Sequence, residues 1–364
     1  MSSEGPSQGE GAQLLRTRVL PILFLGLLFG ALWWRRPADE APEPTAATAP
    51  PALRLTGPSM GTTWHATVVG GADPSRATMA VQGALDAVDA RMSTWKPESE
   101  LSLLNRAPAG DHPVSPELGE VLAISFEINL LSGGAFDVTI APIVDAWGFG
   151  PDRPEAAPSA EQVQALRELV GPDKLAFSDD RRALVKSADG VRADLSAVAK
   201  GYGVDKAAQA LLALGYTDLM VEVGGEVRAH GRNPDGQPWR IGVERPDGSS
   251  AVEQVVALDT MSMATSGDYR NYRELDGQRV SHTIDARTGE PIRHGLASVS
   301  VLHPSCAWAD AWATALNVLG PEAGPALATR LDLPALFIVR SPDGFRSIAS
   351  PTWPAPPAPA QEIP

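Results

Sequence analysis

Residues 194–205 read Asp-Leu-Ser-Ala-Val-Ala-Lys-Gly-Tyr-Gly-Val-Asp, and this stretch is expected to run from a strand or turn into a helix. Val204, Ala207 and Leu211 recur at the spacing of an apolar helix face. The amino end of a helix offers free N–H groups and the positive end of the helix dipole, which favours phosphate. Lys200 would add a positive charge there. The spacing is not that of a Walker loop, and an ordinary glycine turn with a solvated lysine explains these residues at least as well.

Strands and helices mix on both sides of this stretch without a regular βαβ repeat. Apolar patterns indicate strands around 64–68, 219–223, 240–243 and 297–302. Helices are indicated by apolar positions from 81 to 92, by Ser115-Pro116, by the capping box of Ser159 and Gln162 with Gly171-Pro172 closing that helix, and by the segment 306–319. This mixture predicts an α+β fold.

The composition limits the classes of function. The chain has 364 residues, 43% of them hydrophobic, which is enough for a substantial core. Its formal net charge is −14, and a protein that binds the phosphate backbone would instead carry basic stripes, so we expect no nucleic-acid partner. The one cysteine, Cys306, excludes a disulfide within the chain and fits a buried small hydrophobe.

The amino-terminal part of the chain has the composition of a membrane anchor and a tether. A polar segment, 1–18, precedes an apolar run at 19–34 that ends at Arg35 and Arg36, so 19–36 is expected to be a transmembrane or signal-anchor segment. A Pro/Ala-rich linker follows at 37–52. The folded body should occupy 53–350, and a Pro-rich tail should occupy 351–364.

Two further clusters could bind a ligand or a metal ion. Gly224 and Gly225 follow an apolar strand and would allow close approach of a flat or phosphorylated ligand, although a plain hairpin turn explains them equally well. Asp310 and Thr314 are four residues apart, so their oxygens share one face of an otherwise apolar helix. Mg²⁺ accepts such oxygens, but an aspartate that caps a helix or pairs with an arginine is about as probable from these residues alone.

A general base is suggested by the segment 281–289, Ser-His-Thr-Ile-Asp-Ala-Arg-Thr-Gly. His282 lies there among a hydroxyl, a carboxylate, an arginine and a glycine turn, whereas the other histidines are best read as structural. A phosphate cradle, metal-binding oxygens and a base together are the inventory that phosphoryl transfer needs.

With these motifs in place, the sequence resembles the ApbE family of FAD:protein FMN transferases over nearly the whole body, about 59–339. The stretches that carry the resemblance come in family order: 60–62, 93–105, 134–139 with Pro142 and 147–149, 194–205, 224–225, 264–269, 281–289 and 309–315. The resemblance implies a single compact, T-fold-related domain behind the amino-terminal anchor. Trp95 stands where the family commonly has tyrosine, which keeps ring stacking and removes a phenolic hydrogen bond.

The resemblance also assigns roles to residues. It implies that FAD contacts Met60, Trp95, Ala135, Phe136, Asp137, Asp194, Lys200 and Ile284. It implies that Mg²⁺ is held by Asp310 and Thr314, with help from the backbone carbonyls of Ala197 and Ala313. His282 would be the acid/base or would orient the acceptor.

The implied reaction is attack by a threonine (or serine) hydroxyl of an acceptor protein on the phosphorus of the FMN half of FAD, with release of AMP. The acceptors of the family are subunits of membrane redox complexes, so the catalytic domain is expected on the periplasmic or extracytoplasmic side. Two alternatives stay open. The same site could hydrolyse FAD to FMN and AMP, or the protein could bind or scavenge flavin without catalysis, a role that would not use Asp310 with Thr314.

Overall fold

The computed structural model describes residues 51–151, 154, 156–179, 183–249, 251–267, 272–275 and 278–357. The expected anchor at 19–36, the segment before it and nearly all of the expected linker lie outside these residues, so they stay predictions. No helix in the described ranges is both long and apolar enough to span a bilayer.

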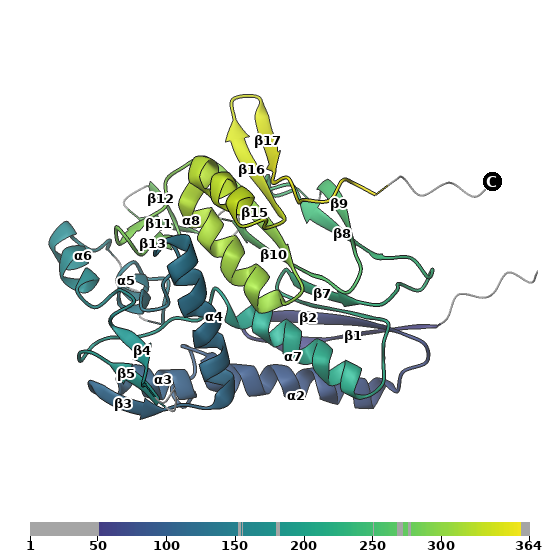
Figure 1. Ribbon diagram of the computed structural model, residues 1–364, viewed down its shortest axis with the longest axis horizontal. Helices are drawn as coiled ribbons and strands as arrows, with labels where there is room; N and C mark the ends of the chain where they lie inside the picture. The colour runs from purple at the N-terminus through teal and green to yellow at the C-terminus, as the bar shows by residue number, and fades with distance from the viewer. Residues whose placement is uncertain are drawn as a thin grey trace, which may run out of the picture. The chain divides into compact units, whose positions relative to one another are not determined.

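An eight-stranded sheet, antiparallel throughout, forms the centre of the described body (Figure 1). In spatial order its strands are β1 (Ala52–Ser59), β2 (Thr62–Val69), β6 (Leu219–Val223), β7 (Glu226–His230), β10 (Ser262–Gly267), β15 (Leu296–His303), β16 (Ala335–Ser341) and β17 (Gly344–Ala349). The register pairs Trp64 of β2 with Val223 of β6, which places the turn between β6 and β7 beside the start of β2.

Four long helices pack together against this sheet: α2 (Pro74–Met92), α4 (Pro116–Ser132), α7 (Ala199–Ala213) and α8 (Cys306–Arg330) (Figure 1). Three short helices complete the helical part: α3 (Glu100–Arg106), α5 (Ala141–Ala146) and α6 (Ala160–Arg167). The segregation of helices and antiparallel strands confirms the predicted α+β class.

Small hairpins and one small sheet surround the central sheet. One sheet has three strands, β3 (Gly110–Pro113), β5 (Ala183–Lys186) and β4 (Leu175–Phe177). The hairpins are β8 (Trp239–Glu244) with β9 (Val252–Leu258), β11 (Tyr272–Leu275) with β12 (Gln278–Ser281), and β13 (Ile284–Asp285) with β14 (Glu290–Pro291).

The central strands are buried on both faces. Along β16, Phe337 belongs to the main apolar cluster with the helices, whereas its neighbours Leu336 and Ile338 join a second cluster with the β8–β9 hairpin. Alternate side chains of a strand point to opposite faces, so a strand covered on both sides becomes continuously apolar. Trp353 joins the second cluster, so the packed body extends past Ser350.

Most of the elements expected from sequence are present. Ser115 and Ser159 accept hydrogen bonds at the starts of α4 and α6, and the capping box of α6 is complete. The α6 helix ends at Arg167, earlier than Gly171-Pro172 indicates. The helix expected at 306–319 continues to Arg330, but Gly320 has φ 80° and breaks it into two segments, so the first segment ends where the sequence predicts.

Candidate active site

A cavity of about 970 Å³ opens between the sheet and the amino end of α7. It collects nearly all of the residues expected at the site, from segments far apart in the sequence. Its lining includes Trp95, Ala135, Phe136, Asp137, Asp194, Ala197, Lys200, His282, Ile284, Asp310 and Thr314. The two expected residues outside this lining are Met60, which packs between two apolar clusters, and Ala313, which is fully buried in the core.

The stretch 194–205 contains the first turns of α7, which pack against α8. Asp310 accepts a hydrogen bond through Oδ2 from the backbone N–H of Gly201, at 3.0 Å, so its carboxylate caps the first turn of α7. A Cβ at Gly201 would lie 2.3 Å from the carbonyl oxygen of Cys306. The glycine is therefore needed because the two helices approach closely, and it lies within the helix, not in a glycine turn. The bond uses one oxygen of Asp310 and leaves the other for a ligand.

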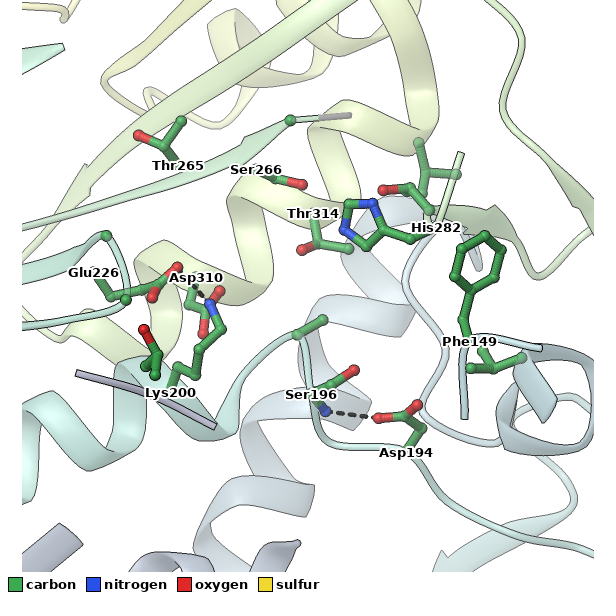
Figure 2. Close-up of a pocket in the computed structure, with 18 of the residues that line it drawn as sticks. Phe149, Asp194, Ser196, Lys200, Glu226, Thr265, Ser266, His282, Asp310 and Thr314 are labelled. Atoms are coloured by element: carbon green, nitrogen blue, oxygen red, sulfur yellow. Dashed lines mark hydrogen bonds and ion pairs between the residues drawn. The ribbon is translucent and has the colours of Figure 1, made fainter. Parts of the chain in front are cut away.

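Lys200 forms an ion pair with Glu226, the first residue of β7, with 2.6 Å between Nζ and Oε1. Glu226 is buried, whereas the Lys200 side chain keeps 33% of its surface exposed and lines the cavity. Figure 2 shows the side chains of Glu226, Lys200 and Asp310 grouped on one side of the cavity. The lysine is therefore held by a specific carboxylate and is not a freely solvated side chain.

The three charges shift one another's protonation. Burial raises the pKa of Glu226 to about 7, although the charge of Lys200 acts in the opposite direction. Burial likewise raises the pKa of Asp310, against the effect of Lys200 and of the Gly201 hydrogen bond. Burial alone would lower the pKa of Lys200, but the charges of Glu226 and Asp310 outweigh it and raise that pKa. The lysine therefore stays cationic near neutral pH.

His282 lies on the opposite side of the cavity, near Thr314 in the view of Figure 2. Its ring meets the ring of Phe149 edge to face, with 6.4 Å between centroids. Arg273 donates to the carbonyl oxygens of Trp147 and Pro154, at 3.0 Å each, and so ties β11 to the loop that carries Phe149. The histidine thus belongs to a packed wall of the cavity.

Two further carboxylates that line the cavity, those of Asp137 and Asp194, have firm structural partners. Asp137 accepts hydrogen bonds from Thr139 and Asn129, and its burial raises its pKa in spite of them. Asp194 accepts from the backbone N–H of Ser196 at 2.7 Å, which shapes the turn before α7. Trp95 is 56% exposed and lines the cavity.

The donors on α8 fit a hard cation. Asp310 and Thr314 are one turn apart on the cavity side of the helix, and both line the cavity. Carboxylate and hydroxyl oxygens are ligands that Mg²⁺ accepts. Asp310 and Glu226 place two buried carboxylates beside the one positive charge of Lys200, and Glu226 Oε2 is buried without a hydrogen-bond partner. When both carboxylates are ionised, the local excess of negative charge favours a cation.

The sequence reasoning missed Glu226 and Phe149 as members of the site. Phe149 ends the stretch 147–149 and Glu226 directly follows Gly224-Gly225, but neither residue received a role. An acidic residue that opens a buried strand directly after a tight hairpin is a usable signal, because a buried charge needs a partner. The glycines of that hairpin have φ 59° and 107°, so they form the turn that the sequence allowed as one of two readings.

Comparisons with known proteins agree with this geometry. The model of the ApbE family matches residues 60–337. The FAD:protein FMN transferases of Haemophilus influenzae and Vibrio cholerae are each 41% identical to the chain, which aligns over 80% and 82% of its length and over 88% and 90% of theirs. The solved flavin transferase ApbE from Vibrio cholerae superposes with TM-score 0.78 at 39% identity, covering 84% of this chain and 98% of that one.

A second solved structure, the apo form of the flavinyl transferase ApbE from Pseudomonas stutzeri, superposes with TM-score 0.76 at 40% identity. It covers 83% of this chain and 96% of that one. The family match spans every residue that lines the cavity. The chain belongs to the ApbE family.

Proposed function

We propose that this protein is an FAD:protein FMN transferase that attaches FMN through a phosphoester bond to a threonine (or serine) hydroxyl of an acceptor protein. The observation that carries the proposal is the single cavity that places Lys200, Asp310, Thr314 and His282 on facing walls. The names of the relatives, 37–41% identical over most of the chain, support the same activity.

The substrate is positioned by the protein's own groups. Lys200 would bind the negative pyrophosphate of FAD, since its ammonium lines the cavity and stays cationic. Trp95 and Phe136 offer apolar surface for the ring systems. We propose that Ala135, Asp137, Asp194 and Ile284, which also line the cavity, complete the contacts with FAD. Met60 would contribute only through the packing behind α7.

The transfer step is a nucleophilic substitution at phosphorus. The acceptor oxygen forms a bond to the phosphorus of the FMN half, the bond from that phosphorus to the bridging oxygen breaks, and AMP leaves. His282 takes the proton of the attacking hydroxyl or orients that hydroxyl, since it is the half-buried imidazole on the cavity wall. Phe149 holds its ring edge to face.

Asp310 and Thr314 would hold Mg²⁺, with Ala197 and Ala313 contributing backbone carbonyls. When bound, the ion would neutralise negative charge on the phosphates of FAD. The acidity of the chain makes this contribution important, because a net charge of −14 disfavours the binding of an anionic nucleotide.

We also propose that residues 19–34 attach the protein to a membrane and that the catalytic domain faces the periplasm or another extracytoplasmic space. The support is the apolar run between arginines, with Trp33 and Trp34 at its end as suits a membrane interface. The acceptor would then be a subunit of a membrane redox complex. Membrane fractionation of the full chain, against a variant that lacks residues 1–36, tests this attachment.

The activity is tested with the full-length protein in detergent, incubated with FAD, Mg²⁺ and a threonine-bearing subunit of a membrane redox complex. We expect a fluorescent acceptor band on a denaturing gel, and its loss in Asp310→Ala and His282→Ala. Free FMN and AMP without a labelled band would instead indicate FAD pyrophosphatase activity. Bound FAD that stays intact would indicate a flavin-binding protein without catalysis.

A further inference from the structure

Two buried carboxylates, those of Glu226 and Asp310, lie beside Lys200 at one corner of the cavity. The proposed reaction assigns a role to Asp310 but none to Glu226. It lies at the start of β7, is 2% exposed, and its Oε1 is 2.6 Å from the ammonium of Lys200. Its Oε2 is buried without a hydrogen-bond partner. Burying a carboxylate is costly unless it is paired, and the partner of Glu226 is Lys200.

The alternative partner of Lys200 is Asp310. The backbone of the next residue, Gly201, is hydrogen-bonded to Asp310, so Lys200 and Asp310 are anchored to the same turn of α7. Within the described part of the chain, the ion pair of Lys200 is nevertheless with Glu226 and not with Asp310. Figure 2 shows the lysine side chain extending past the start of α7 toward both carboxylates.

An ion pair between Lys200 and Asp310 would compete directly with a metal ion. A lysine carries a compact positive charge on a flexible stem and would neutralise the carboxylate that the cation needs. Glu226 comes from a different element, the β6–β7 hairpin, and can hold the ammonium without using any oxygen of α8. The tight turn at Gly224-Gly225 fixes its position.

We propose that Glu226 is a positioning residue that holds Lys200 away from Asp310, so that Asp310 stays open to a divalent cation while Lys200 stays available to phosphate. The proposal rests on the proposed function, because it assumes a cation at Asp310. It assigns to the Gly-Gly-Glu hairpin a role distinct from contact with the flavin.

The test measures Mn²⁺ binding to the full-length protein in detergent without FAD, by the decrease of the electron paramagnetic resonance signal of free Mn²⁺. Glu226→Gln keeps the shape of the side chain and removes its charge. We expect the affinity for Mn²⁺ to fall about tenfold or more, as is typical when a group that orients a metal ligand is changed. Lys200→Met combined with Glu226→Gln should restore the affinity to near the wild-type value, since the competing ammonium is gone.

Glu222→Gln is the matched control. Glu222 also lines the cavity, accepts a hydrogen bond from Gly225, and has no ion pair with Lys200 in the described structure. This variant also removes one negative charge from the cavity but leaves Lys200 paired, so the affinity for Mn²⁺ should change little. If Glu222→Gln and Glu226→Gln lose the same affinity for Mn²⁺, the loss follows from the removal of one negative charge anywhere in the cavity, and the proposal is wrong.

The remaining outcomes separate this proposal from the proposed function. If the double variant stays as weak as Glu226→Gln, Glu226 acts on the metal itself and the proposal is wrong. If Glu226→Gln binds Mn²⁺ as the wild type does while Asp310→Ala does not bind, only the positioning role fails. If the wild type binds no Mn²⁺, or if Asp310→Ala binds it unchanged, the metal site of the proposed function fails as well.

Discussion

Gly201 lies where α7 and α8 approach so closely that no side chain fits. An added Cβ would lie 2.3 Å from the carbonyl oxygen of Cys306 and 2.8 Å from Cβ of Asp310. Gly201→Ala should therefore destabilise the protein by about 1–3 kcal/mol, as overpacking does, and should also reduce transfer because Asp310 must move. Urea unfolding and the fluorescent-band assay measure the two effects.

Gly83→Ala is the control for this substitution. Gly83 also lies in a helix, α2, but is exposed, and an added Cβ there meets nothing within 4 Å. This variant should be more stable than the wild type by about 0.5–1 kcal/mol, because alanine favours the helix. A Gly201→Ala protein as stable and active as Gly83→Ala would contradict the close helix contact.

His303 predicts a pH dependence of stability. Its ring stacks on Trp308 at 5.6 Å and its Nδ1 accepts from the N–H of Ser305. Burial lowers its pKa from 6.5, against smaller opposing effects of Ser305 and Asp205. Below pH 6.5 the unfolded chain then binds more protons than the folded one, so the free energy of unfolding falls as the pH drops.

The measurement is urea unfolding of the wild type and of His303→Asn between pH 7.5 and about pH 5, where the unfolded imidazole titrates. Asparagine keeps an acceptor for Ser305 and cannot titrate. The loss of stability on acidification should be smaller in the variant. The same slope in both proteins would contradict a lowered pKa, whatever the other groups contribute, because those groups are common to both.

The site residues that could be predicted from the sequence are those whose side chains can bind phosphate, bind a metal ion or transfer a proton. Asp310, Thr314, Lys200 and His282 all line the cavity as expected. The role of Glu226 depends on the approach of β7 to α7, a contact between distant segments that no local spacing encodes. The hydrogen bond from Gly201 of α7 to Asp310 of α8 is likewise a long-range contact. From the sequence alone, a helix cap and a metal ligand were therefore two alternative roles for Asp310.

The carboxyl end of helix α3 is hydrogen-bonded to a side chain from strand β5. Lys186 of β5 is buried and donates to the carbonyl oxygens of Leu104, Asn105 and Ala107, at 3.1, 3.3 and 2.6 Å. The carbonyl oxygen of Leu104 also accepts from the N–H of Ala107, whereas the carbonyls of Asn105 and Ala107 lie where the helix ends and no further turn follows. A cation there also complements the helix dipole. Lys186→Met should therefore cost about 2–3 kcal/mol, because it leaves buried acceptors unsatisfied.

Lys96→Met makes the same chemical change at a surface ion pair. Lys96 is 54% exposed and pairs with Asp89 at 2.5 Å, and such pairs contribute about 0–1 kcal/mol. Urea unfolding should thus separate the two variants clearly. Equal small losses would mean that α3 does not need its cation.

The helix and strand positions were predictable where local signals are strong. Ser115-Pro116 and the Ser159/Gln162 box mark real helix starts, because caps act within one turn. The continuation of α8 beyond Gly320 was not predictable in this way. Gly320 and Pro321 end a regular helix, yet packing of Leu327 and Ala328 into the main cluster keeps a second helical segment in line.

At the scale of the whole molecule, the antiparallel sheet decides where the site lies. Its order places β2 beside β6 and β7 beside β10, although β2 ends at Val69 and β10 begins only at Ser262, so the cavity draws on the whole body. Composition and periodicity predict the α+β class but no strand order, because pairing between distant strands is set by packing.

The central claim is that this cavity moves FMN from FAD to an acceptor protein. The most direct test is intact-mass analysis of a threonine-bearing acceptor after reaction with FAD and Mg²⁺, with AMP measured in the same sample. We expect the acceptor to gain the mass of one FMN less one water and one AMP to appear for each modified acceptor, with neither in His282→Ala. AMP release with an unmodified acceptor, or no release at all, would contradict the claim.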